Sequence, residues 1–105
     1  MRIDQHQSQT ILETSRRFLG EGATVMLFGS RGDDAAKGGD VDLYIETHEP
    51  PGIWRKAQLL AELEKRLGLP VDLVLHAQNE PEKPIHRIAR LTGVALSRTN
   101  LPLGN

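Results

Sequence analysis

The 105-residue chain contains no cysteine, which excludes disulfide bridges and zinc sites built from thiolates. It also has no basic excess, because 13 lysines and arginines stand against 14 aspartates and glutamates. This balance disfavours nucleic acid and membrane surfaces as partners. No apolar run approaches the roughly 20 residues that span a bilayer, and the start, MRIDQHQSQT, lacks the apolar core of a signal peptide. We therefore expect a cytoplasmic protein.

Apolar periodicity predicts three long helices. The first ends at Gly20, the second is closed by Gly68 and Pro70, and the third lies within PEKPIHRIARLTG, residues 81–93. A short helix is also plausible over residues 31–36. The residues expected in the core of these helices are Ile11, Leu12, Phe18, Leu19, Trp54, Leu59, Leu60, Leu63, Leu67, Ile85, Ile88, Ala89 and Leu91.

Short runs rich in β-formers predict the strands. They are ATVMLF at residues 23–28, a period-two segment that starts at Asp40, VDLVL at 71–75, and a short edge strand at 94–97. Residues 98–105 have the composition of a loose tail, and no linker divides the chain. We expect one domain over residues 1–105, of the α/β (α+β) class, with a small mixed sheet and helices mainly on one side.

Aspartate is disfavoured in strands, yet Asp40 and Asp42 begin the second predicted strand. Alternation puts both on one face, and Asp72 near the start of the next strand can join them. Such a cluster of carboxylates repels itself unless cations bind there, and hard oxygen ligands suit Mg²⁺. We therefore expect a site for two Mg²⁺ ions, an arrangement suited to phosphoryl-type transfer.

A Gly-Ser step precedes these aspartates. Gly29 lets the backbone approach a ligand closely, and Ser30 can offer its hydroxyl and the N–H groups of a helix N-terminus to a triphosphate. Arg31 is a further candidate phosphate contact, although a surface position on the first helical turn accounts for it equally well. The pattern thus combines an anion-binding turn with a cation-binding group of carboxylates.

The order Gly29-Ser30-Arg31, then Asp40-Val41-Asp42-Leu43, then Val71-Asp72-Leu73 resembles the minimal nucleotidyltransferases (MNT) of the DNA polymerase β superfamily. The resemblance implies the nucleotidyltransferase fold and ATP as substrate. It also implies that Gly29 and Ser30 hold the β- and γ-phosphates, that Asp40 and Asp42 bind two Mg²⁺ ions, and that Asp72 binds the catalytic metal and helps to activate the hydroxyl. Gly39 departs from the serine that many relatives have there.

Stand-alone MNT proteins resemble the antitoxin half of a two-component system. The partner in such a system is an all-helical HEPN ribonuclease toxin. The resemblance implies transfer of AMP from ATP to a tyrosine of that toxin, which silences it. Three alternatives stay open on the residues themselves. They are an antitoxin that acts by steric binding, a nucleotide-binding interaction module, and a transferase with a small-molecule acceptor.

Other polar residues favour structural roles. The four histidines, His6, His48, His76 and His86, lack metal-ligand spacing, so solvated or capping positions are expected. Arg87 and Arg90 on the last predicted helix could form a basic strip with Arg98 that faces a partner, but a solvated helix face is the simpler interpretation.

Overall fold

The computed structural model describes residues 4–28 and 41–96. Within these ranges the chain forms three helices and four strands, in the order α1 (Gln5–Leu19), β1 (Thr24–Leu27), β2 (Val41–Thr47), α3 (Ile53–Leu67), β3 (Val71–Ala77), α4 (Pro84–Thr92) and β4 (Val94–Leu96). Every long helix and strand expected from the sequence is present in these ranges. The short helix predicted at 31–36 and the tail at 98–105 lie outside the described residues.

The four strands form one mixed sheet in the order β3-β2-β1-β4. β1 pairs antiparallel with both β2 and β4, whereas β2 and β3 run parallel. The crossover between the parallel strands contains α3, as a parallel pair requires. The mixed sheet and its flanking helices confirm the predicted fold class.

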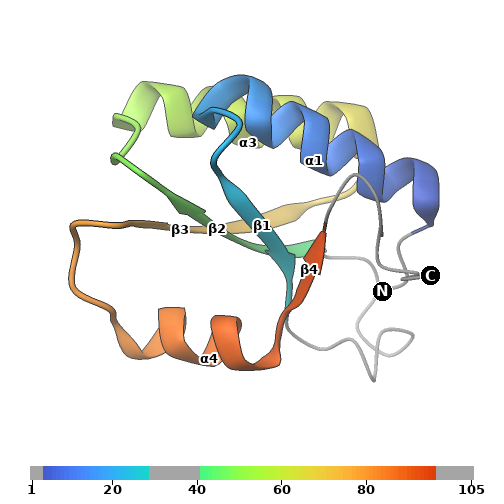
Figure 1. The fold of residues 1–105 in the computed structure, drawn as a ribbon. Coiled ribbons are helices and arrows are strands. Elements are labelled where there is room, and N and C mark those ends of the chain that lie inside the picture. Colours follow the sequence, from blue (N-terminus) through green and yellow to red (C-terminus); the bar gives the residue numbers. More distant parts are fainter. Residues whose placement is uncertain (1–3, 29–40, 97–105) are drawn as a thin grey trace.

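Two layers of helix cover the sheet (Figure 1). α1 and α3 lie side by side on one face, and α4 lies on the other. Local signals fix the ends of the long helices. Asp4 accepts the Gln7 backbone N–H at 2.7 Å at the start of α1, and Gly68 ends α3 in the left-handed region at φ +71°, a conformation that glycine adopts without strain. The prediction of helices mainly on one side is thus met by α1 and α3.

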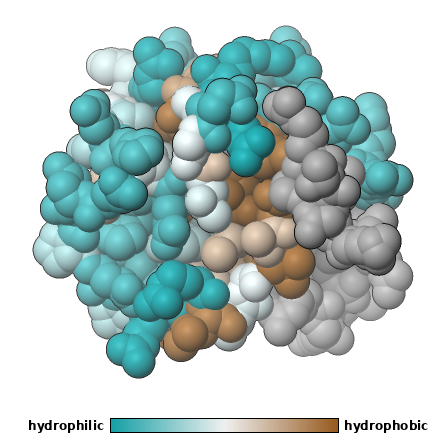
Figure 2. All heavy atoms as spheres, viewed as in Figure 1, coloured by the Kyte–Doolittle hydropathy of each residue, from teal (hydrophilic) through white to brown (hydrophobic). Residues whose placement is uncertain are grey.

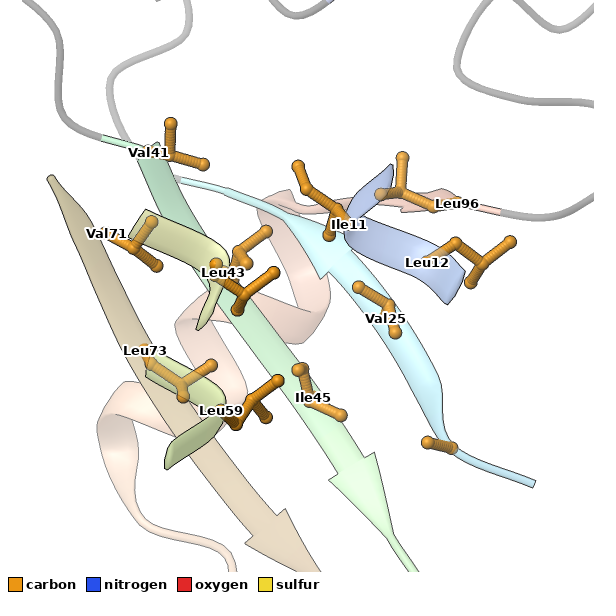
Figure 3. Packing of buried hydrophobic residues seen from close by; sticks show 12 residues of the cluster. Ile11, Leu12, Val25, Val41, Leu43, Ile45, Leu59, Val71, Leu73 and Leu96 are labelled. Atoms are coloured by element: carbon orange, nitrogen blue, oxygen red, sulfur yellow. The ribbon is translucent and has the colours of Figure 1, made fainter. Parts of the chain in front are cut away.

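The main core lies between the sheet and the α1–α3 layer. Alternate strand residues point into it, among them Val41, Leu43 and Ile45 of β2 and Val71 and Leu73 of β3 (Figure 3). They meet Ile11 and Leu12 of α1 and Leu59 and Leu63 of α3, which are almost fully buried. Because side chains alternate along a strand, burying this set directs Asp42, Tyr44 and Asp72 to the opposite face.

Four predicted core residues are exposed. Trp54 is 80 % exposed at the start of α3, and Ile85, Ile88 and Leu91 lie on the outer side of α4. For α4 the expectation is confirmed at Ala89 but wrong for the three larger residues, because the helix packs on the sheet through His86 and Ala89, which are 6 % and 0 % exposed. His86 was expected in a solvated or capping position. It is buried, and it caps the start of α4, because its side chain accepts the backbone N–H of Lys83.

The outer edge of β3 is partly capped by side chains. Glu64 Oε2 accepts the Val71 N–H at 2.8 Å, and Glu80 Oε1 accepts the Ala77 N–H at 3.0 Å. The Pro70 carbonyl accepts from β2 and the Gln78 N–H donates to β2. Because backbone groups alternate in direction along a parallel strand, the even-numbered N–H groups of β3 face β2 and the odd-numbered ones face outward. The two glutamates therefore occupy the first and last outward donors of this edge strand.

Candidate functional site

Two aspartates meet at one end of the parallel strand pair. Asp42 of β2 and Asp72 of β3 are register partners, and neighbouring strands lie about 4.8 Å apart. Both side chains point to the face of the sheet that carries α4. Asp42 is half-buried and Asp72 is exposed. The carboxylates thus stand next to each other and reach solvent.

Backbone hydrogen bonds hold this end of the sheet together. The Phe28 N–H donates to the Asp42 carbonyl at 3.0 Å, and the Val41 N–H donates to the Pro70 carbonyl at 2.9 Å. The chain therefore leaves the described residues at Phe28, beside Asp42, and returns at Val41. Phe28 and Val41, the described residues that flank this part of the sequence, consequently lie at the end of the sheet that carries Asp42 and Asp72.

The structure brings together two of the six residues expected in the site, Asp42 and Asp72. The other four, Gly29, Ser30, Arg31 and Asp40, lie outside the described residues, and their roles stay predictions. Paired carboxylates at a solvent-accessible strand end have the oxygen donors that suit Mg²⁺. Within residues 4–28 and 41–96, no group of three His, Asp or Glu residues could hold a metal ion, so a complete site would need a ligand such as Asp40.

A polar network continues along the same face, and the sequence analysis did not identify it. The Tyr44 hydroxyl donates to Glu46 Oε2 at 2.8 Å and lies 3.2 Å from His76 Nδ1. Burial, and then the hydrogen bond to Glu46, raise the pKa of Tyr44 well above its usual value. Strand alternation could have found this cluster. Tyr44 and Glu46 lie an even number of residues from Asp42, and His76 lies an even number from Asp72, so all of them are on the same face of the sheet.

α4 closes over this network. The His86 ring stacks on His76 with centroids 4.2 Å apart, and His86 Nδ1 accepts the Lys83 N–H at 3.1 Å. Burial, followed by the neighbouring His76, lowers the pKa of His86, so the neutral ring that can accept this hydrogen bond is favoured. Arg90 adds an ion pair to Glu82, with N–O separations of 2.9 and 3.1 Å.

A hollow lies on this face at the end opposite to Asp42 and Asp72. It is a polar pocket of about 240 Å³ whose lining includes Thr24, Glu46, His48 and His76. His48 Nδ1 and Gln78 Oε1 are 3.0 Å apart across the same lining. Because Glu46 and His76 are already bonded within the network with Tyr44, this pocket is an extension of that network rather than a separate group of ligands.

A mixed sheet with paired strand aspartates, preceded in the sequence by a Gly-Ser step, is typical of a nucleotidyltransferase-type domain. The family model described as polymerase beta, nucleotidyltransferase matches residues 10–100. The chain belongs to this family. No curated protein sequence matches the chain.

Solved structures with the same fold include MNT antitoxins. One is the MNT antitoxin in complex with a tri-AMPylated HEPN toxin of Shewanella oneidensis, with 19 % identity, a TM-score of 0.68, and coverage of 87 % of this chain and 69 % of that one. Another is the toxin–antitoxin MntA–HepT, with 17 % identity, a TM-score of 0.69, and coverage of 88 % and 70 %. At these identities the likeness shows the fold.

None of the helices in the described parts of the chain is both long enough and apolar enough to cross a membrane.

Proposed function

We propose that this protein transfers AMP from Mg-ATP onto a hydroxyl, that of a tyrosine, on a helical HEPN-type toxin, and so acts as its antitoxin. The observation that carries this proposal is the register pairing of Asp42 with Asp72 at the end of the sheet where the Gly-Ser segment begins. Membership of the nucleotidyltransferase family supports the chemistry. The matched MNT antitoxin with an AMPylated HEPN toxin supports the acceptor.

We assign a role in this reaction to each residue of the candidate site. Gly29, Ser30 and Arg31 would bind the β- and γ-phosphates, while Asp40 and Asp42 would hold Mg²⁺ with Asp72. Bound there, two Mg²⁺ ions would supply positive charge to the triphosphate and to the attacking and leaving oxygens. Asp72 is exposed, so its carboxylate can reach an incoming hydroxyl and accept the proton.

The reaction is a single displacement at the α-phosphorus. The acceptor oxygen forms a bond to that phosphorus, the bond to the oxygen that bridges to the β-phosphate breaks, and pyrophosphate leaves. Positioning and electrostatic stabilisation would supply most of the rate. Removing one carboxylate should therefore lower the rate by orders of magnitude, because the groups act as a unit.

Asp42→Asn tests the proposal, with Glu49→Gln as the control that removes one exposed carboxylate elsewhere. Each variant is incubated with the HEPN-type toxin proposed as its partner, Mg²⁺ and ATP, and the partner is weighed by intact-mass spectrometry. Wild type and Glu49→Gln should add the mass of AMP, and Asp42→Asn should not, although it still binds the partner. If no form adds mass and Asp42→Asn neutralises the toxin as well as wild type, the protein is a steric antitoxin instead.

A further inference from the structure

The outer face of α4 carries an apolar stripe. Ile85, Ile88 and Leu91 recur at every third residue and are 43, 55 and 66 % exposed, while the helix buries the smaller or more polar Ala89 and His86. Val94, at the start of β4, is 40 % exposed and lies three residues after Leu91 in the chain. Figure 2 shows hydrophobic atoms at the lower edge of the molecule, where Figure 1 places α4. Large apolar side chains exposed in a row on one helix face are typical of a protein interface.

The stripe leads toward the paired aspartates. His86, in the first turn of α4, stacks on His76 of β3, and His76 is the register partner of Glu46 in β2. The start of α4 therefore lies level with Glu46 and His76. At its end, a Cβ on Gly93 would lie 3.1 Å from the Leu27 carbonyl oxygen, and Leu27 pairs with Leu43. Leu91 and Val94 are therefore at the end of the sheet face that carries Asp42.

The charges beside the stripe favour an acidic partner. Lys83 and Arg87 are exposed, whereas Arg90 is already paired with Glu82. A second copy of this chain would pair α4 with α4 about a twofold axis, since such an interface uses the same patch on both molecules. Centred on Ile88, that arrangement would bring the two Arg87 side chains together, and their repulsion disfavours it.

We propose that the outer face of α4, formed by Ile85, Ile88, Leu91 and Val94 with Arg87 beside it, docks an amphipathic helix of the acceptor protein whose apolar stripe is bordered by carboxylates. The apolar stripe of the docked helix packs along α4. The partner extends past Leu91 and presents its hydroxyl at Asp42 and Asp72. This docking rests on the proposed function for the identity of the partner.

Binding without nucleotide tests the docking separately from the chemistry. The HEPN-type toxin proposed as the partner is titrated into wild type, Ile88→Ser, Leu91→Ser and Trp54→Ser in the absence of ATP and Mg²⁺. Trp54 is the matched control, because it is also a large exposed apolar residue but lies on α3, in the other helical layer. Circular dichroism and the thermal midpoint establish that each variant is folded.

Ile88→Ser and Leu91→Ser should each weaken binding about tenfold or more, as expected for anchors at the centre of an interface, and Trp54→Ser should bind as wild type does. Arg87→Glu should weaken binding and flatten its dependence on salt. Equal affinity for Ile88→Ser and wild type would overturn the docking surface. The proposal would also be overturned if sedimentation shows that wild type is a dimer and that Ile88→Ser is a monomer, since the stripe would then be covered by a second copy.

The two proposals fail in different ways. If Ile88→Ser loses the partner but wild type never adds AMP to it, the docking surface stands and the transfer chemistry is wrong. If Ile88→Ser adds AMP at the wild-type rate, the chemistry stands and the docking surface is wrong. If wild type does not bind the HEPN-type protein at all, the docking proposal is wrong together with the proposed partner.

Discussion

Asp42 and Asp72 are register partners on two parallel strands, with both carboxylates on the same face of the sheet. Like charges placed directly opposite on neighbouring strands destabilise a sheet by up to about 1 kcal/mol. The same pairing supplies adjacent oxygen ligands where the Gly-Ser segment begins. The arrangement therefore favours a function that brings positive charge to this end of the sheet.

Magnesium together with ATP should stabilise the folded protein. Ligands that bind only the folded state raise the unfolding free energy by about 2.7 kcal/mol at 100 times their dissociation constant, which a thermal melt detects. Asp72→Asn should remove most of this shift, whereas Glu49→Gln, with the same change of charge at an exposed loop position, should keep it. ATP with a chelator should give a much smaller shift. Equal shifts with and without Mg²⁺ would indicate that phosphate contacts make up the whole site.

Tyr44→Phe should destabilise the fold although the change removes one oxygen atom. The hydroxyl is fully buried and lies within hydrogen-bond distance of Glu46 and His76. Its loss leaves these groups without their partner, which costs about 1–3 kcal/mol. Urea unfolding at pH 7 measures the difference. A cost close to zero would mean that water replaces the hydroxyl without penalty.

His86 should make stability depend on pH. Burial and His76 hold its folded-state pKa below the ordinary 6.5, so the unfolded chain binds the proton more readily. The stability it contributes is present above pH 6.5 and is lost as the pH falls below that value toward the folded pKa. Lys83 also lowers this pKa, while Glu80 and Glu82 raise it.

The matched variant is His86→Gln, because glutamine does not titrate and its side-chain oxygen can accept the Lys83 N–H at the same helical position. Urea unfolding at pH 7 and pH 5.5 should show a smaller loss of stability in the variant than in wild type. Equal losses in both proteins would assign the pH dependence to other groups.

Gly93→Ala should strain the junction of α4 and β4. An added Cβ would lie 2.6 Å from the Ala89 carbonyl oxygen and 3.2 Å from the Met26 Cβ, so helix and strand would have to separate. Overpacking of this kind costs about 1–3 kcal/mol. Gly52→Ala is the control, since an added Cβ there meets nothing within 4 Å. Thermal melts that show equal effects for both variants would contradict the close packing.

Apolar periodicity was enough to predict the main layer. Leu43, Ile45, Leu59 and Leu63 were identified from spacing, and they are fully buried between the sheet and the α1–α3 layer. The third strand is longer than the predicted 71–75, because β3 continues in register with β2 as far as Ala77. Hydrogen bonds to a neighbouring strand extended it, and a single segment does not reveal them.

The arrangement of α4 could not be predicted from periodicity. Its apolar residues have the spacing that normally marks a buried face, but the helix packs through Ala89 and through His86, which finds an aromatic neighbour in His76. This contact joins residues on different elements. For the candidate site, alternation predicted that Asp42 and Asp72 would share a face, but it could not show that they are paired.

The glutamates at the edge of β3 bear on how the protein behaves when many copies are crowded together. An open parallel edge is a template on which further strands can add, and such addition leads to aggregates. Glu64 and Glu80 leave Leu73 and Leu75 as the outward donors between them, which is too short a ladder to hold an incoming strand firmly. The side-chain caps therefore disfavour strand addition at this edge, which leaves other surfaces of the protein for specific contacts.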